Sequence, residues 1–352
     1  MDTLSATGFR LSDALYQDVL HRAGEGESRR GRGATRGRGA LEATRAPFFP
    51  GRPLRPLASA PRSALRARAQ AASERAHVPF SGRAAAAALL FDDGVWAPGV
   101  RVESASFSLT IPPALNAYTT AVASGRRAIV AAAFSRPVRR VERAFLDDLP
   151  GGPFRMPGEH VCVADGAAPL PSPRRRLTPF LDDGPVETPR AGTARARSLA
   201  RNRALVPASR FPVGGVLAVA GRLVPGVNVE PHADPARAEW THVLCAERNA
   251  LGTACSYGLL GAGAADDPEA SSEAPSGNDA PTAPALYLSC PEAPSGGSPC
   301  GACRQLLVEL LPRGGLWMDR APPGGAPERA RPADLLPGSF QGTSLPRGAP
   351  SA

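Results

Sequence analysis

The sequence contains no lysine: all 41 of its basic residues are arginine, and glycine and proline are abundant. Such a skew is typical of a GC-rich genome, so the formal net charge of +9 is weak support for a nucleic-acid partner. The arginines gather before residue 80 and in residues 174–203, where we expect a solvated tail and linker. Aromatic residues are also few, and residues 26–76 contain Phe48 and Phe49 alone. Because single-stranded nucleic acids bind by stacking on aromatic side chains interleaved with positive charge, nucleic-acid binding is disfavoured.

Long hydrophobic runs are absent as well. No stretch reaches the ~18 apolar residues needed to cross a bilayer, and the N-terminus lacks the apolar core of a secretory signal. Five acidic side chains near the N-terminus argue against an organelle transit peptide: Asp2, Asp13, Asp18, Glu25 and Glu27. The six cysteines leave no even disulfide framework once the three described below are set aside. We therefore expect a cytoplasmic protein without membrane contact.

Two segments have compositions that cannot bury a core. Residues 1–60 are dominated by arginine, glycine and proline, most of all between residues 26 and 55. We predict that this N-terminal region is disordered. Residues 261–284 are rich in alanine, serine, proline and acidic side chains. We predict a flexible insertion there, and we interpret it as a spacer rather than as a gate over a site.

Two short motifs place three cysteines and one glutamate at predicted helix starts. Cys300 and Cys303 precede a run of leucines at helical spacing, so both sulfurs can point from one helix start. Cys245 and Glu247 open a second helical run in the same way. Helix N-termini favour anions, which lowers thiol pKa values and helps to hold thiolates. Three thiolates bind Zn²⁺ and leave a fourth tetrahedral position free, as in catalytic zinc sites, with Glu247 placed to carry a proton.

Each motif alone has another explanation. A lone Cys-x-x-Cys can be a redox pair or half of a structural zinc site, and a Cys-Ala-Glu segment can be a buried thiol beside a surface carboxylate. A structural site would need a fourth ligand from Cys255, Cys290 or His242. Cys255 lies about three helical turns beyond Cys245, too far to reach the same metal ion. Cys290 ends an apolar, strand-like run typical of a buried core, so we predict an open site with three cysteine ligands.

The order of predicted elements occurs twice along the chain. In each half, a helix leads into a Val-Pro-x-Ser segment, a buried strand, a turn and a Gly-Val-x-Val-Glu segment. With Ser81 set on Ser209 and Glu103 on Glu230, the halves stay within one residue of register. The second half has six more residues between Glu230 and Cys245 than the first has at the same place.

The first half lacks the metal-binding residues in this register. In place of the three thiols and the glutamate it has four residues without metal-binding groups: Pro112, Ala114, Val138 and Val141. Val138 and Val141 fall opposite Cys300 and Cys303, and we interpret them as apolar replacements of similar size. We predict that the first copy binds no metal ion and is kept for packing.

The second half resembles the cytidine deaminase family in five segments that occur in the family's order: residues 211–214, 226–230, 245–248, 299–305 and 335–340. The likeness covers about residues 195–342, and a weaker one covers about residues 65–183. It implies an α/β fold of two cytidine-deaminase-like domains, each a mixed β-sheet flanked by helices in a three-layer α/β/α arrangement. The implied organisation is a degenerate domain over residues 61–185 and a catalytic domain over residues 186–345.

The resemblance also implies an activity, the zinc-dependent hydrolytic deamination of cytidine and 2′-deoxycytidine to uridine and 2′-deoxyuridine. It would make Glu247 the proton carrier, and it gives one Zn²⁺ per chain, in the C-terminal domain, with three ligands: Cys245, Cys300 and Cys303. Arg248 would hydrogen-bond the ligand thiolates. The implied substrate-binding residues are Phe211, Asn228, Glu230 and Ala246, with Asn228 and Glu230 on the ribose hydroxyls and Phe211 near the base.

Two-domain members of the family assemble as dimers, so we expect a homodimer, in which Phe340 could reach a neighbouring site as the family's terminal phenylalanine does. A carboxylate such as Glu230 beside the sugar would repel a phosphate, which favours a free nucleoside as substrate. Two alternatives stay open. One is a deaminase of a modified cytosine nucleoside, and the other is a polynucleotide cytosine deaminase that uses the arginine-rich N-terminus.

Overall fold

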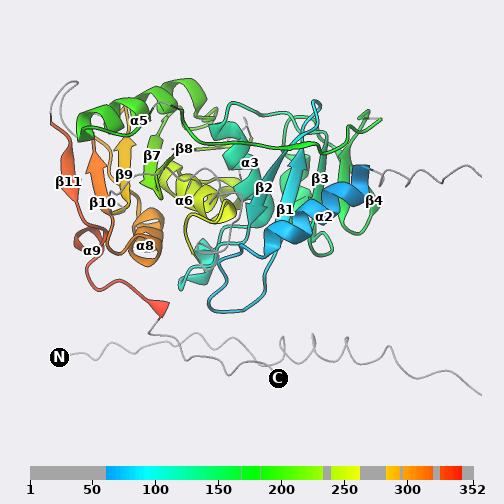
Figure 1. The fold of residues 1–352 in the computed structure, drawn as a ribbon, viewed down its shortest axis with the longest axis horizontal. Helices are drawn as coiled ribbons and strands as arrows, with labels where there is room; N and C mark the ends of the chain where they lie inside the picture. The colour runs from blue at the N-terminus through cyan, green and yellow to red at the C-terminus, as the bar shows by residue number, and fades with distance from the viewer. Residues whose placement is uncertain are drawn as a thin grey trace, which may run out of the picture. The chain divides into compact units, whose positions relative to one another are not determined.

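Two mixed β-sheets, one in each half of the chain, form the framework of the protein (Figure 1). The structure is a computed structural model and describes residues 61–167, 169–182, 184–232, 239–261, 283–293, 296–319 and 326–342. The predictions for residues 1–60 and for nearly all of residues 261–284 lie outside these ranges. No helix within them combines the length and hydrophobicity that a bilayer crossing needs. Both sheets belong to one compact unit, so the domain boundary at residue 185 stays a prediction.

The second sheet has the strand order β11-β10-β9-β7-β8. Strand β7 pairs antiparallel with β8 and β9, and β10 pairs antiparallel with β11. The β9–β10 pair is parallel and is connected through α8, because parallel neighbours need a crossover. The bounds are β7 Gly214–Val219, β8 Arg222–Val227, β9 Ala285–Ser289, α8 Gly301–Leu310, β10 Gly315–Met318 and β11 Glu328–Ala330, followed by α9 Pro332–Leu335.

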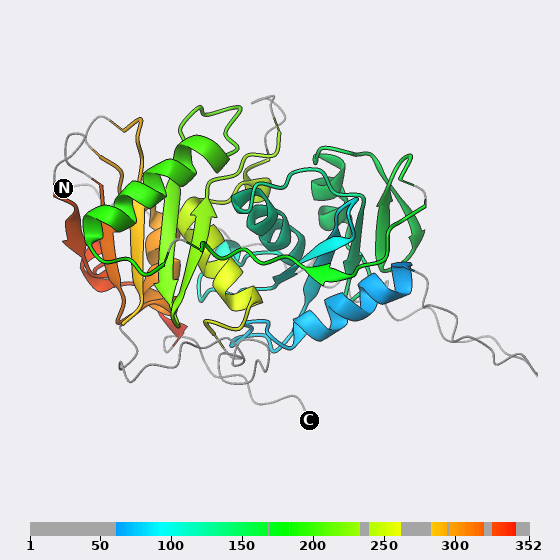
Figure 2. The same ribbon diagram turned by 45° about the horizontal axis from the view of Figure 1, so that its top comes forward.

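Helices cover both faces of this second sheet (Figures 1 and 2). Helix α5 (Pro189–Arg203) lies on one face, and α6 (Ala246–Ser256) lies on the other with α8. Two glycines on opposite faces make the close approach possible. A Cβ atom at Gly214 would lie 2.0 Å from the Ala196 carbonyl of α5, and one at Gly226 would lie 2.2 Å from the Ala246 carbonyl of α6. The predicted three-layer arrangement is confirmed for this half.

The first sheet has the order β4-β5-β3-β1-β2-β6, with helix α2 on one face and α3 on the other. Its one parallel pair is β2–β6, which makes it a mixed sheet as predicted. The copies diverge after their last long helix, because β5 pairs antiparallel with β3 whereas β10 pairs parallel with β9. The bounds are α2 Pro61–Ser73, β1 Ala86–Leu90, β2 Val95–Val100, α3 Pro113–Ala123, β3 Ala131–Phe134, α4 Arg140–Asp147, β4 Phe154–Gly158, β5 Val161–Ala164 and β6 Arg175–Arg176.

The repeat predicted from the sequence is confirmed by matched backbone contacts. His77 bridges to Val102 in the first half as Leu205 bridges to Val229 in the second. The carboxylate that follows each bridge accepts a hydrogen bond of 3.0 Å from the matched serine N–H, Ser81 to Glu103 and Ser209 to Glu230. The two halves are therefore copies of one local structure up to this point.

Helices α3 and α6 pack against one another and join the halves. Each has eleven residues, and Thr120 and Thr253 are both the eighth residue of their helix. Their hydroxyl oxygens are 2.7 Å apart, a contact between equivalent residues of the kind found on a twofold axis. Asn116 strengthens the contact by donating from Nδ2 to the Gly252 carbonyl at 3.1 Å. The two copies are therefore related by an approximate twofold axis through this helix pair.

Glu103 is a buried carboxylate that ties the start of the first domain together. It is 3% exposed and accepts hydrogen bonds from the N–H groups of Phe80 and Ser81 and from the Ser81 hydroxyl. Arg101 lies 2.9 Å away. Although burial acts to raise the pKa of Glu103, the hydrogen bonds from Ser81 and Phe80 and the charge of Arg101 hold it below its ordinary value.

We expect Glu103→Gln to lower the free energy of unfolding by about 2 kcal/mol at pH 7, because a charged acceptor with several donors is lost. A lowered pKa gives stabilisation that is present above the unfolded pKa and is lost as the pH falls through the folded pKa. The deficit should therefore shrink below about pH 4. Urea unfolding of the wild type and of Glu103→Gln, at pH 7 and below about pH 4, measures the difference in unfolding free energy. Exposed Glu74→Gln is the control. Equal unfolding free energies of the wild type and Glu103→Gln at pH 7 would contradict this prediction.

One predicted correspondence between the copies was wrong by one residue. Helix α4 begins after the N-cap residue Arg139, as α8 begins after Cys300. Counted from these starts, Arg139 and Glu142 take the places of the thiols, and Val141 is 68% exposed rather than packed inside. Glu142 is buried and bound by the Arg136 guanidinium through two contacts of 3.0 and 2.8 Å. An ion pair, and not a pair of valines, stands at this helix start.

Candidate metal centre

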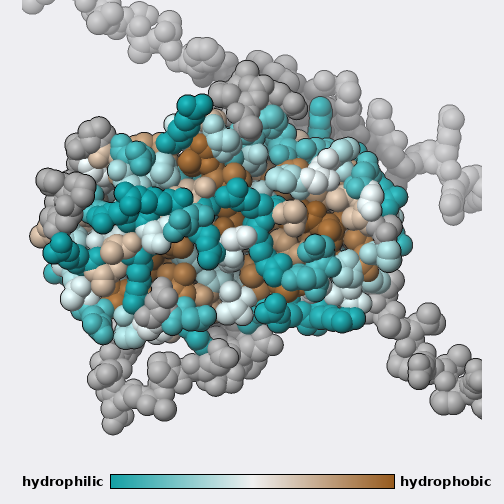
Figure 3. All heavy atoms as spheres, turned by 90° about the horizontal axis from the view of Figure 1, so that it is seen from above, coloured by the Kyte–Doolittle hydropathy of each residue, from teal (hydrophilic) through white to brown (hydrophobic). Residues whose placement is uncertain are grey.

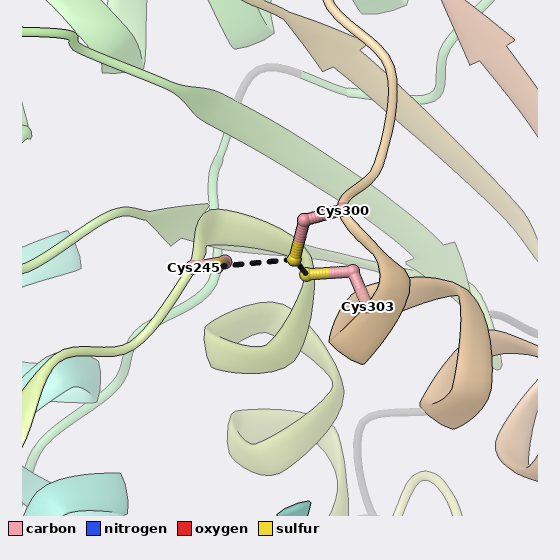
Figure 4. Close-up of side chains that lie close together, drawn as sticks. All are labelled: Cys245, Cys300 and Cys303. Atoms are coloured by element: carbon pink, nitrogen blue, oxygen red, sulfur yellow. Dashed lines mark hydrogen bonds between the residues drawn. The ribbon is translucent and has the colours of Figure 1, made fainter. Parts of the chain in front are cut away.

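Three thiols from the starts of two helices meet in the second half (Figure 4). Cys245 is the N-cap of α6, and Cys300 is the N-cap of α8, both with extended backbone. Cys303 is the third residue of α8. The Cys300 sulfur lies 3.8 Å from that of Cys245 and 3.5 Å from that of Cys303. The two motifs identified in the sequence, 55 residues apart, therefore form one cluster.

The donor set fits a zinc ion. Zn–S bonds of about 2.3 Å in a tetrahedron set the sulfurs about 3.8 Å apart, close to the observed separations. Within the described ranges this is the one group of three or more His, Cys, Asp or Glu residues whose ligand atoms all lie within 4.8 Å of one another. The three alternative ligands considered from the sequence, Cys255, Cys290 and His242, are not members of it. Three protein ligands leave a coordination position for chemistry.

The shifted pKa values of the three thiols favour binding of a cation. Hydrogen bonds with Cys245 and Cys303, together with the backbone N–H groups at the start of α8, lower the pKa of Cys300. The pKa of Cys303 is raised by its hydrogen bonds to the two neighbouring thiols and by burial, and that of Cys245 is raised to about 12, first by its hydrogen bond to Cys300. Without a metal ion, one thiolate is therefore stabilised at the expense of the other two.

Glu247 lies beside the thiols as the second residue of α6 and is 3% exposed. Burial raises the pKa of its carboxyl to about 7, and the charge of Cys300 acts in the same direction. A carboxyl group that is half protonated near neutral pH can both accept and donate a proton during one reaction. The buried position thus suits the role of proton carrier predicted from the sequence.

Arg248 contacts the first half of the chain, and its hydrogen bonds to the ligand thiolates stay a prediction. Its Nη2 donates to the backbone carbonyl of Leu109, in the first half, at 2.9 Å, and its Nε is buried without a partner. No hydrogen bond from Arg248 to the three thiols occurs among the described contacts. Because Arg248 follows Glu247 directly, it attaches the start of α6 to the other copy.

Two of the four predicted substrate-binding residues, Asn228 and Glu230, follow β8 and lie next to the thiol-bearing segment. Asn228 binds the backbone around Phe211, donating to its carbonyl at 2.8 Å and accepting from the Val213 N–H at 2.7 Å. One oxygen of Glu230 accepts from the Ala208 and Ser209 N–H groups at 3.2 and 3.0 Å.

Backbone pairing connects residues 228–230 to the metal centre. Val229 pairs with Leu244, the residue before Cys245, so Asn228 and Glu230 run alongside the metal-binding segment. Ala246 is fully buried, whereas Phe211 is 39% exposed at the edge.

The first copy also reaches the second metal-bearing helix, which no sequence motif predicted. The Ser104 hydroxyl and the Ala105 N–H both donate to Glu309 of α8, at 2.8 and 3.0 Å. Gln305 of the same helix donates to the Phe340 carbonyl. Phe340 is 46% exposed, and its predicted contact with a neighbouring site stays a prediction. Contacts between copies leave no local pattern in either segment, so only the three-dimensional structure reveals them.

Comparison with known proteins gives the family. The cytidine and deoxycytidylate deaminase zinc-binding region matches the chain twice, over residues 51–144 and residues 189–313. A cytidine deaminase of Sporosarcina psychrophila is 32% identical over 147 residues, which cover 42% of this chain and 87% of that protein. The chain belongs to the cytidine and deoxycytidylate deaminase family and contains two deaminase regions.

Solved structures of cytidine deaminases are similar over a like share of the chain. That of Burkholderia pseudomallei is 29% identical, covers 44% of this chain and 99% of its own, and has a TM-score of 0.31. That of Mycobacterium tuberculosis is 29% identical, covers 43% of this chain and 93% of its own, and has a TM-score of 0.24. The family assignment rests on the sequence matches.

Proposed function

We propose that the second domain catalyses the hydrolytic deamination of cytidine and 2′-deoxycytidine to uridine and 2′-deoxyuridine, with release of ammonia. The observation that carries the proposal is one buried carboxyl, Glu247, beside three thiols gathered from two helix starts. Cys245, Cys300 and Cys303 would hold one zinc ion. The S. psychrophila relative, a cytidine deaminase, supports the same reaction class.

The reaction requires both protons of one water molecule to be moved, and Glu247 is the group that moves them. When bound by the three thiolates, zinc supplies the Lewis acidity that activates a water molecule at neutral pH. Glu247 takes the first proton of that water and delivers it to N3 of the cytosine ring, and it then carries the second proton of the same water to the departing amine. The C4–N bond breaks, ammonia leaves, and the oxygen of the water becomes the new carbonyl oxygen at C4.

The sugar would bind at Asn228 and Glu230. The sugar hydroxyls donate well to a short pair of acceptors, and the Asn228 side chain is already held in place by the Phe211–Val213 backbone. A phosphate close to the Glu230 carboxylate would be repelled. A nucleoside is therefore favoured over a nucleotide.

The polynucleotide alternative gains no support from the arginines of residues 174–203. The face that carries α5, at the top of Figure 1, has hydrophilic residues interspersed with hydrophobic patches (Figure 3). Three arginines of α5 contact other parts of the protein: Arg195 donates to the Gly184 carbonyl, Arg197 to Asp319 and Arg203 to the Ala123 carbonyl. These guanidinium groups stabilise the fold, so they are a weak basis for a nucleic-acid groove.

The first domain would then be a non-catalytic copy. Its helix starts carry Pro112 and Arg139 where the second domain has Cys245 and Cys300. The approximate twofold axis between the copies gives one chain the arrangement of a dimer. We therefore propose that two chains assemble as a homodimer with one zinc ion in each.

A direct assay tests the proposal. The purified protein is incubated with cytidine, 2′-deoxycytidine, CMP and a short single-stranded DNA, and the absorbance change from cytosine to uracil is followed. Turnover of the two nucleosides supports the proposal, and turnover of the polymer alone overturns it. A zinc content near one per chain agrees with a single centre, whereas a content near two would refute the non-catalytic first copy.

Glu230→Gln should raise KM for cytidine about 10- to 100-fold, because a charged acceptor of a hydroxyl hydrogen bond is replaced by a neutral one. We expect kcat to change far less, since the carboxylate is remote from the reacting atoms. Glu103→Gln is the matched control: the same change at the equivalent position of the first domain should leave KM unaltered. An unchanged KM in Glu230→Gln would exclude Glu230 from the sugar site.

A further inference from the structure

The described ends of the segment between Glu230 and Cys245, residues 231–232 and 239–244, lie close together in the second domain. Val229 and Leu244 pair across its base, with N–H to carbonyl distances of 3.0 and 3.2 Å. We call residues 231–232 and 239–244 the two stems of the segment. Glu230, the proposed sugar ligand, therefore lies directly before the first stem, and Cys245 lies directly after the second. This is the segment that is six residues longer here than in the first copy.

Asp148 of the first domain, the C-cap of α4, touches both stems of the segment. Its Oδ2 lies 2.8 Å from Nδ1 of His242, and its Oδ1 lies 3.9 Å from Nε2 of His232. The side chains of His242, His232 and Asp148 are 11, 18 and 20% exposed, so solvent screens these contacts little. The His242 ring also meets Phe145 of α4 edge-on, with centroids 5.2 Å apart.

The same carboxylate shares a cavity with Glu230. Asp148, Glu230, His232 and His242 all line a space of about 10 Å³, enough for roughly one water molecule. Because the cavity is this small, a displacement of Asp148 or of either histidine changes the surroundings of Glu230 directly. A charged group of the first domain is therefore part of the environment of the proposed sugar site in the second.

We propose that Asp148 is a positioning residue for substrate binding: it binds His242 by a hydrogen bond, lies beside His232 and thereby fixes Glu230. The inference rests on the proposed function, which assigns Glu230 to the sugar. Both histidines come from the segment that lengthens the second copy, and the carboxylate comes from the first copy. Through this side chain the first domain would serve the proposed sugar site of the second.

Kinetics of two Asp148 variants test the proposal. Asp148→Ala removes the acceptor and leaves a shielded His242 ring nitrogen without its partner, so KM for cytidine should rise about tenfold while kcat stays within about twofold. Asp148→Asn keeps an acceptor oxygen at the same place and should bring KM back to within about threefold of wild type. Zinc should remain at one per chain in both. Exposed Asp165→Ala is the matched control and should change neither constant.

Hydrogen–deuterium exchange gives a readout that does not depend on activity. In Asp148→Ala the amides of Val229 and Leu244 should exchange about tenfold faster, while those of α5 keep the wild-type rate. Unchanged exchange at these amides, or a fall in kcat with unchanged KM, overturns the proposal. If the wild-type protein deaminates no cytosine nucleoside, the proposed function fails. In that case hydrogen–deuterium exchange alone tests the positioning role of Asp148. Faster exchange at Val229 and Leu244 in Asp148→Ala supports the role, and unchanged exchange rejects it.

Discussion

Replacing Glu247 by glutamine should lower kcat for cytidine about 100- to 10,000-fold, the usual contribution of a positioned general acid–base group. Glutamine has nearly the same shape but can neither take up nor release a proton at neutral pH. The zinc content should stay near one per chain, because Glu247 is not one of the three thiol ligands. Steady-state kinetics together with metal analysis of the same sample separate a lost proton carrier from a lost metal ion.

The matched control is Glu292→Gln, the same chemical change at an exposed position of the second domain. Its kcat should equal that of the wild type. If Glu247→Gln kept a kcat within about tenfold of wild type, another group would have to move the proton, and the proposed mechanism would be wrong.

The burial of Glu247 supplies a second readout in metal-free protein. Burial raises the pKa of this carboxyl to about 7, so the folded chain prefers the neutral form. The stability linked to that form is present below the pKa of the unfolded chain, about 4.3, and is lost as the pH rises through about 7. Metal-free Glu247→Gln should therefore melt at a higher temperature than metal-free wild type at pH 8, and at the same temperature at pH 4.

The cluster of three cysteines could be predicted from sequence because its spacing is local. Cys300 and Cys303 are fixed relative to one another by a single helical turn, and Glu247 is tied to Cys245 in the same way. The proximity of the two helix starts depends on the tertiary structure, and it was inferred from the resemblance to a known family. The repeat could be read for a related reason, since Glu103 and Glu230 bind the preceding turn through the same backbone contacts.

Contacts between the copies could not be predicted in this way. Arg248 donates to the Leu109 carbonyl of the first copy, and nothing near Arg248 in the sequence signals that carbonyl. The predicted correspondence of Val141 with Cys303 was wrong because one residue is inserted before α4. The valine is therefore exposed to solvent. The contacts of Asp148 could not be predicted either, because its histidine partners lie more than eighty residues away, in the other domain.

Replacing any one of the three clustered cysteines by serine should weaken zinc binding by about 100-fold or more, because even groups that only support a ligand contribute 10- to 100-fold. Activity should fall with the zinc content, and the variants should melt at a lower temperature than the zinc-bound wild type, since bound metal stabilises the folded chain. Competition with a chromophoric chelator measures the affinity. The three variants are Cys245→Ser, Cys300→Ser and Cys303→Ser.

Cys290→Ala separates a catalytic from a structural zinc site. Cys290 is a buried thiol of the same domain that lies outside the cluster, so this variant should keep its zinc and its activity. Loss of zinc from Cys290→Ala would mean that a fourth sulfur closes the coordination shell, and a closed shell leaves no position at which water can be activated. Retention of zinc in Cys290→Ala, with loss in all three serine variants, therefore tests the number of protein ligands, on which the proposed chemistry depends.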